Sequence, residues 1–239
     1  MPAIHGLNKT TLLDYPGRIA AVVFLGGCNF RCPFCQNSSL VLHPSEEPVI
    51  PEEEVLTFLK KRQGILEGVC SAGGEPTLAS DLEDFIKKIH SLGYPVKLDT
   101  NGTRPDIVQH LAENNLIQMV AMDIKASPEN YPSLTGMLHP DLESVRETAD
   151  FLLHGKLDYE FRTTVVRELH NENDFIQISQ WLKSAPAISY IFPSEPSSRS
   201  CRYINPPHSA IHGTPTVTAW QILSRIESFS LNSFAFSSG

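Results

Sequence analysis

The sequence predicts an α/β fold, a partial (β/α)6-type, TIM-like barrel followed by an atypical C-terminal tail. Three observations support this: short apolar runs alternate with amphipathic segments about six times, the connections are short, and polar groups follow nearly every predicted strand. Because consecutive parallel strands need a helical crossover, the alternation predicts a parallel sheet. The polar groups at the strand ends favour a barrel, and an open doubly wound sheet is the alternative.

The first unit begins with residues 18–27, RIAAVVFLGG, an apolar run rich in β-branched residues. This pattern predicts a strand that is buried on both faces. A cysteine-rich loop, residues 27–37, begins where the strand ends. Residues 51–63 then predict a helix, because Pro51 and the three glutamates after it suit a helix N-terminus.

The second unit pairs a strand at 65–74 with a helix at 81–93. We expect Ser80 to cap this helix and Gly93 to close its C-terminus. The later units follow the same order, with strands near 94–102, 117–126, 158–166 and 187–192 and helices at 104–114, 142–155 and 171–184.

The pattern breaks near residue 187, which divides the chain into one domain, 1–186, and a Ser/Pro-rich tail, 187–239. The tail has almost no Lys, Asp or Glu and little sustained periodicity. One interpretation is an irregular segment that packs on the domain or is disordered. The other is a shift of the coding frame near Ala187, which sequencing of the DNA would test.

The formal net charge of -8 argues against nucleic acid or an anionic membrane as the main partner, since both require clustered Lys and Arg. No stretch approaches the eighteen or so apolar residues of a membrane span, and the N-terminus lacks the pattern of a signal peptide. We therefore expect a cytoplasmic protein. Three of the five cysteines crowd into one loop, which in a reducing compartment indicates metal binding or redox chemistry.

Cys28, Cys32 and Cys35 form a C-x3-C-x2-C pattern that supplies three thiolates to a soft metal centre. A structural zinc site needs four protein ligands, and His43 is the nearest candidate for the fourth. The alternative is an iron–sulfur cluster with three irons held by the protein and one left open for a substrate or cofactor.

The segment CNFRCPFC, with Phe34 directly before the third cysteine, resembles the signature of radical S-adenosylmethionine (SAM) enzymes. The segment GGEPTL at 73–78 resembles the glycine-rich motif of that superfamily, which contacts the methionine end of the cofactor. The resemblance implies a 4Fe–4S cluster held by the three cysteines and bound SAM. The cofactor-binding residues that these two motifs imply are Phe34, Gly73, Gly74, Glu75 and Pro76.

The segments LDTNGT, AMDIKAS and FRTTVV resemble motifs of glycyl-radical-activating enzymes, in some of which a monovalent cation helps to hold the cofactor. Paired carboxylates can bind the ammonium group of a zwitterionic ligand or a cation, and a lysine can bind its carboxylate. A structural ion pair between Lys125 and Asp123 or Asp99 is an equal alternative for the lysine. The further residues implied by the resemblance are Asp99, Thr100, Asn101, Asp123, Lys125 and Arg162.

The opening segment, with KTTLLDYPG, is similar to one type of anaerobic ribonucleoside-triphosphate reductase activating protein. This resemblance covers roughly residues 5–186 and stops at the tail. It implies that the reduced cluster cleaves SAM to a 5'-deoxyadenosyl radical, which takes a hydrogen atom from a glycine of a partner enzyme. A flavodoxin- or ferredoxin-type protein would supply the electron. A radical SAM enzyme for a small molecule and a non-catalytic zinc-binding module are the rival hypotheses.

Overall fold

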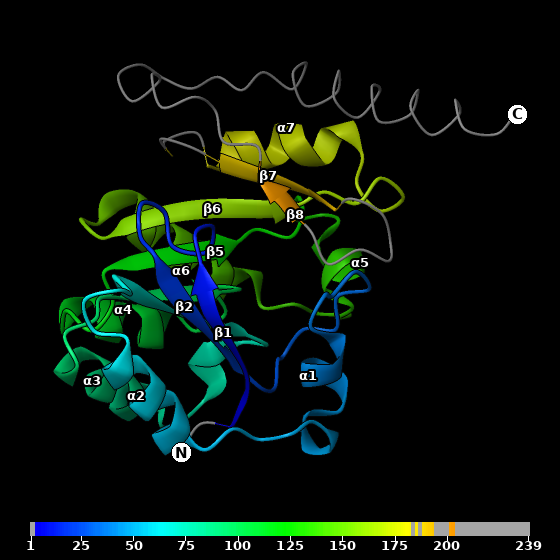
Figure 1. The fold of residues 1–239 in the computed structure, drawn as a ribbon. Coiled ribbons are helices and arrows are strands. Elements are labelled where there is room, and N and C mark those ends of the chain that lie inside the picture. The colour runs from blue at the N-terminus through cyan, green and yellow to red at the C-terminus, as the bar shows by residue number, and fades with distance from the viewer. Residues whose placement is uncertain (1–2, 183–184, 186–187, 194–200, 204–239) are drawn as a thin grey trace, which may run out of the picture.

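The structure is a computed structural model that describes residues 3–182, 185, 188–193 and 201–203 (Figure 1). Within these residues, eight strands form one sheet whose spatial order follows the chain order. None of the described helices combines the length and apolar character that a membrane span requires.

The middle six strands are parallel, and the outer two are antiparallel to their neighbours. The strands are β1 (Ile4–Thr11), β2 (Ala20–Leu25), β3 (Gly68–Gly73), β4 (Val96–Thr100), β5 (Met119–Asp123), β6 (Asp158–Thr164), β7 (Ile188–Pro193) and β8 (Cys201–Tyr203). The described strand pairings run from β1 to β8 without closing a ring. The predicted partial barrel of six parallel strands is therefore confirmed.

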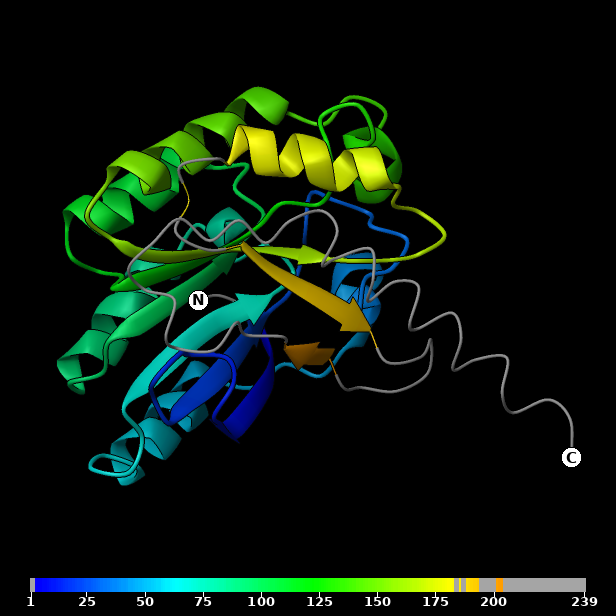
Figure 2. The same cartoon turned by 90° about the horizontal axis from the view of Figure 1, so that it is seen from above.

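Five longer helices lie along the convex outer face of the sheet (Figure 2). They are α2 (Glu52–Lys61), α3 (Leu82–Ser91), α4 (Pro105–Glu113), α6 (Leu142–His154) and α7 (Glu172–Trp181). Helix α3 shows why they pack there: its Phe85, Ile86 and Ile89 lie on one face and are fully buried. Alternate strand residues such as Val23 and Leu98 complete this outer core.

Most predicted elements are confirmed to within a few residues, but the cap of α3 is wrong. Asp81, rather than Ser80, is the N-cap residue. The reason is a turn at Ser80 and Asp81, closed by the Leu82 N–H on the Ala79 carbonyl at 3.1 Å, so that the helical hydrogen bonds begin with the Asp81 carbonyl. Gly93 has a φ of +87° and donates its N–H to His90, so it closes the helix as predicted.

Besides the 3₁₀ turns at Pro44–Glu46 and Pro76–Leu78, one strand and two α-helices before residue 187 were not predicted. They are β1 and two five-residue helices, α1 (Ser38–Leu42) and α5 (Tyr131–Thr135). Strand β1 is an edge strand with exposed polar residues and two irregularities in its pairing, so it lacks a clean alternation. Both helices are too short for a helical period to show in the sequence.

The predicted tail, 187–239, is described only at β7 and β8. Strand β7 pairs in parallel with β6, and β8 pairs antiparallel with β7, so the sheet extends past residue 187. The other residues of the tail lie outside the described part of the chain. The hypothesis of a frame shift near Ala187 is therefore not tested by the structure.

Candidate functional site

The cysteine loop follows β2 and is held by α5 and the residues after it. The Arg31 N–H donates to the Thr135 carbonyl at 2.7 Å, and a Cβ on Gly136 would lie 2.3 Å from the Arg31 oxygen. Arg31 also turns its guanidinium back onto the loop, where Nη1 donates to the Cys28 carbonyl at 2.6 Å. The ring of Phe30 is buried against that of Tyr131 in an edge-on contact. These contacts fix the backbone between the first two cysteines.

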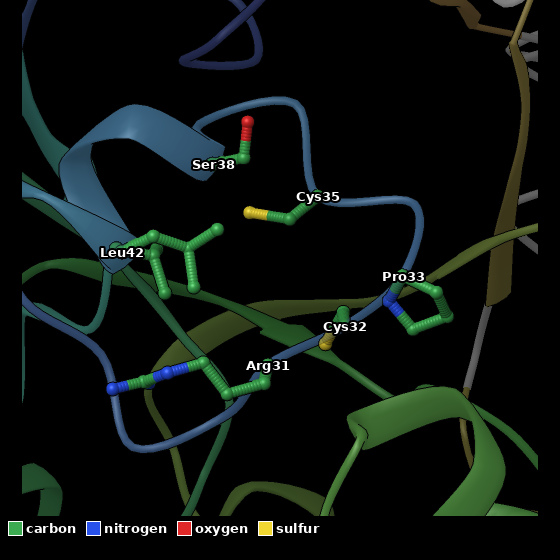
Figure 3. A pocket seen from close by; sticks show the side chains of 7 residues that line it. Arg31, Cys32, Pro33, Cys35, Ser38 and Leu42 are labelled. Carbon is green, nitrogen blue, oxygen red and sulfur yellow. The ribbon is translucent and has the colours of Figure 1, made fainter.

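A cavity of about 250 Å³ opens beside the second and third cysteines (Figure 3). Figure 3 shows the Cys35 side chain directed across it toward Ser38 and Leu42. The lining residues are Arg31, Cys32, Pro33, Cys35, Ser38, Val41 and Leu42. The loop therefore presents two of its thiols to a space that a ligand can enter.

The environment of the thiols suits a soft metal centre. Burial raises the pKa of Cys28 to about 11 and also raises the pKa of Cys32, so both thiols are protonated at neutral pH until a metal displaces the proton. The Phe30 N–H already points at the Cys28 sulfur, 3.4 Å away, and the Asn101 amide lies 3.9 Å from it. Hydrogen bonds to sulfur are one way that proteins tune iron–sulfur clusters.

The three cysteines are half-buried free thiols on one short loop, which fits a cluster that takes three protein ligands. Among the described residues, no group of three or more His, Cys, Asp or Glu side chains is already gathered around a common point. His43, the candidate fourth zinc ligand, leaves 63% of its side chain exposed and lies 3.4 Å from Glu46. The structure thus does not bring His43 together with the three cysteines.

The glycine-rich segment follows β3 and lies directly against the end of β2. A Cβ on Gly74 would lie 1.9 Å from the Gly27 oxygen, and Gly73 has a φ of +117°. The N–H groups of Gly74 and Glu75 donate to the carbonyls of Leu25 and Gly27, each at 2.8 Å. Only glycine permits this approach, so the motif fixes the start of the cysteine loop.

The carboxylate of Glu75 is buried and fully engaged within the protein. It accepts hydrogen bonds from the N–H and hydroxyl of Thr77, from the Thr100 hydroxyl at 2.8 Å and from the Asn101 N–H at 2.6 Å. Burial raises the pKa of this carboxyl, and the four hydrogen bonds oppose that rise. Asn101 in turn donates to the Asn29 side chain at 2.8 Å. Through these contacts Glu75 ties the segment after β3 to the segment after β4 and to the cysteine loop.

Four of the predicted residues form one ion-pair network at the strand ends. Arg162 donates through Nη1 to Asp99 and through Nε to Asp123, both at 2.9 Å. Lys125 pairs with Asp123 at 2.9 Å, which is the structural pair raised as an alternative for this lysine. The strand pairing explains the geometry, because Asp123 and Arg162 are direct neighbours in register.

Two charged residues that were not predicted extend this network into the sheet. Lys97 is fully buried, and its ammonium lies 2.6 Å from Asp99 and 3.4 Å from Glu160. A signal was present: Lys97 stands two residues before Asp99 on β4, and Glu160 stands two residues before Arg162 on β6. Positions of the same parity share a face of the sheet, so all four lie on the inner face.

The network keeps its carboxylates ionised. Burial acts to raise the pKa of Asp123, but the charges of Arg162 and Lys125 outweigh it and hold the pKa at about 2. The pKa of Asp99 is lowered in the same way by Arg162 and Lys97. Burial acts to lower the pKa of Lys125, and Asp123 reverses this and raises it. A zwitterionic ligand could exchange with the Asp123–Lys125 pair, since each partner offers the charge that one end of the ligand needs.

Comparisons with known proteins show the family to which the chain belongs. Residues 22–182 match the model of the Radical SAM superfamily. A protein of Methanocaldococcus jannaschii, provisionally named a glycyl-radical enzyme activating enzyme, is 31% identical over 188 residues, which are 75% of this chain and 75% of that protein. A GTP 3',8-cyclase of Helicobacter pylori is 31% identical over 165 residues, which are 66% of this chain and 49% of the cyclase.

Among solved structures, SuiB of Streptococcus suis bound to S-adenosylmethionine aligns with a TM-score of 0.54 at 16% identity, over 76% of this chain and 39% of SuiB. This likeness shows a shared fold. The chain spans less than half the length of SuiB and of the cyclase. Because the family model covers more than half of its residues, the chain belongs to the radical SAM superfamily.

Proposed function

We propose that this chain is an activase that generates a glycyl radical on a partner enzyme, and that the partner is an anaerobic ribonucleoside-triphosphate reductase. The observation that carries the proposal is the similarity to the provisionally named activating enzyme, which extends over three-quarters of both chains. The KTTLLDYPG segment, which resembles activating proteins of that reductase, supports the choice of partner.

Membership of the superfamily implies a 4Fe–4S cluster and S-adenosylmethionine. We assign the cluster to Cys28, Cys32 and Cys35, on the three half-buried thiols of one loop. When bound, the cluster supplies the electron that splits the cofactor and so provides the hydrogen-abstracting radical. The protein needs no acid or base for this; its residues bind, orient and shield.

Residues at the carboxyl-terminal ends of β4, β5 and β6 would hold the amino-acid end of the cofactor. Lys125 offers an ammonium to its carboxylate, while Asp99 and Asp123 offer carboxylates to its ammonium or to a monovalent cation. Arg162 bridges both carboxylates and fixes their spacing. Gly73, Gly74, Glu75 and Pro76 would place their segment beside the cofactor, with Thr100 and Asn101 holding the Glu75 side chain.

The test begins with anaerobic purification and reconstitution, followed by measurement of iron, sulfide and zinc. We expect about four irons per chain in the wild type and a loss of most of that iron in the Cys32→Ser variant. Zinc at one equivalent without sulfide would reject the assignment.

The reconstituted protein is then incubated with S-adenosylmethionine, a reduced flavodoxin or ferredoxin, and the candidate reductase. We expect a glycyl radical in the electron paramagnetic resonance spectrum of the reductase, and no radical when its target glycine is replaced by alanine. Cleavage of the cofactor without a radical on any reductase would contradict the activase.

A radical SAM enzyme for a small molecule is the second candidate, because the similarity to the Helicobacter pylori cyclase reaches 31% over 165 residues. Incubation with GTP and the reduced cofactor system separates the two functions. Consumption of GTP coupled to cofactor cleavage would favour this candidate, and stable GTP beside a radical-bearing reductase would favour the activase.

A further inference from the structure

His170 lies in the connection between β6 and α7, next to Asn171, the N-cap residue of α7. Its imidazole makes polar contacts with two separate segments. The Val166 N–H lies 3.1 Å from Nδ1, and the Lys125 carbonyl lies 2.8 Å from Nε2. Nδ1 also lies 3.2 Å from the Val166 carbonyl. Since a carbonyl can only accept, the contact with Lys125 requires a proton on Nε2.

The same ring also contacts two aromatic side chains. One face stacks on Phe175, with ring centroids 5.7 Å apart and planes at 21°. The ring of Phe34 lies 6.4 Å away at 58°. Phe34 directly precedes Cys35, so His170 touches the cysteine loop and the end of β5 at the same time.

The carbonyl that His170 binds belongs to the residue whose ammonium pairs with Asp123. On its other side, the Lys125 N–H faces the Tyr131 hydroxyl at 3.5 Å. Two side chains from different elements therefore hold the Lys125 peptide groups. Fixing the main chain at this point restricts where the ammonium can reach, which is how positioning residues act on a binding group.

We propose that His170 is a positioning residue that holds Lys125 in a fixed relation to Phe34, and thereby aligns the binding site for the carboxylate of S-adenosylmethionine with the cysteine loop. The proposal rests on the assignment of Lys125 to the cofactor made above. It adds a residue outside every motif that the sequence pattern singled out.

Two substitutions separate the polar role of His170 from its packing. His170→Phe keeps an aromatic ring against Phe34 and Phe175 but loses the donor to the Lys125 carbonyl. His170→Gln keeps an N–H donor that can reach this carbonyl. The connection stays anchored in both variants, because Asn130 holds the Leu169 carbonyl at 2.9 Å and the Asp174 carboxylate at 3.0 Å.

The measurements are the iron and sulfide content, the thermal midpoint of the apoprotein, and the Kd for S-adenosylmethionine by equilibrium dialysis of the reconstituted protein. For His170→Phe we expect unchanged iron and a Kd raised roughly three- to tenfold, the effect of one lost hydrogen bond. For His170→Gln we expect a Kd within about threefold of the wild type, since the donor is restored.

The matched control is His90→Phe. His90 also binds a carbonyl, that of Leu116 at 2.7 Å, but it lies on α3 on the outer face of the sheet. We expect this variant to lower the thermal midpoint of the apoprotein and to leave the Kd unchanged. If His170 has only a structural role, His170→Phe will likewise lower the thermal midpoint and leave the Kd unchanged. That result would overturn the proposal.

A double-mutant cycle tests whether His170 acts through Lys125. Lys125→Met alone should weaken binding, and His170→Phe added to it should cause no further loss. Additive losses would overturn the proposal. The outcomes also distinguish this proposal from the proposed function. If His170→Phe raises the Kd but the wild type forms no glycyl radical on the reductase, only the activase function is rejected. If the wild type carries its full iron content but does not bind S-adenosylmethionine, both proposals are rejected.

Discussion

The inner face of the sheet has two halves that differ in chemistry. The half on β2 and β3 is apolar and carries Val22, Phe24, Cys70 and Ala72. The half on β4 to β6 is charged and carries Lys97, Asp99, Asp123, Glu160 and Arg162. The two halves meet where the Cys70 thiol lies 3.4 Å from Asp99.

The difference shows that neighbouring strands of one sheet contribute different interactions to a site. Burial of apolar side chains is non-directional, so the apolar half does not specify a ligand. Buried charges are costly unless they are paired, so each partner in the charged half has a fixed position. The charged half is therefore the one that can select a charged ligand and place it.

The largest expected effect comes from breaking the charged half at its centre. Arg162→Met removes the cation that bridges Asp99 and Asp123, and each carboxylate then keeps only one lysine. We expect a loss of about 3–5 kcal/mol in the free energy of unfolding, the usual cost of breaking a buried pair. Urea denaturation of the apoprotein measures it.

The control for this substitution is Arg104→Met, because Arg104 pairs with Asp106 at 2.7 Å on the surface. An exposed pair contributes about 0–1 kcal/mol, so this variant should unfold almost as the wild type does. Equal losses of unfolding free energy in the two arginine variants would show that the ion pairs of the charged half stabilise the fold no more than a surface ion pair does.

The next effect tests the contact between the two segments that follow the apolar strands β2 and β3, at Gly27 and Gly74. The Cβ added by Gly74→Ala would meet the Gly27 oxygen at 1.9 Å, so the backbone must move. We expect a loss of about 1–3 kcal/mol, as for other overpacked sites, together with a lower iron content after reconstitution. In Gly17→Ala the added Cβ has nothing within 4 Å, so only the strain of its φ of +75° should appear, with iron unchanged. Normal iron in Gly74→Ala would separate the glycine segment from the cysteine loop.

The smallest expected effect is the response of the charged half to acid. The pKa of Asp123 falls from an ordinary 3.8 to about 2 in the folded protein, so its contribution is present above about pH 4 and is lost as the pH falls toward 2. At 1.36 kcal/mol per unit, this amounts to about 2 kcal/mol. Unfolding free energies between pH 5 and 2 should therefore decline less steeply in Asp123→Asn than in the wild type, as linkage requires. Identical slopes would contradict the assignment of this charge.

Much of the fold could be predicted from the sequence, because apolar periodicity and breaker residues act locally. The strand at β2, the helix α3 and its closure by Gly93 are examples. Strand β1 could not be predicted, since an edge strand that pairs on one side tolerates polar residues. The irregular character of the tail beyond β8 remains a prediction from the sequence.

For the site, the sequence identified the cysteine loop, the glycine segment and the four charged residues at the strand ends. Motif spacing reveals such residues because they share a short segment or follow successive strands. His170 and Lys97 escaped, since their partners lie 45 positions away in the first case and, in the second, include Glu160 two strands along the sheet. The role of His170 depends on contacts between distant segments, which no local pattern records. Lys97 could have been found from its strand position, because it has the same parity as Asp99.

The sequence alone determined the residue chemistry: three thiols on one loop, glycines at a strand end, and carboxylates and cations after later strands. Only the tertiary structure decided how these groups are used. It showed that the Glu75 carboxylate accepts hydrogen bonds from neighbouring segments and that Arg162 bridges two aspartates. It also showed that His170 contacts both the cysteine loop and Lys125. The physical reason is that side-chain identity fixes which interactions are possible, whereas parallel strand register and loop packing fix which partners come within reach.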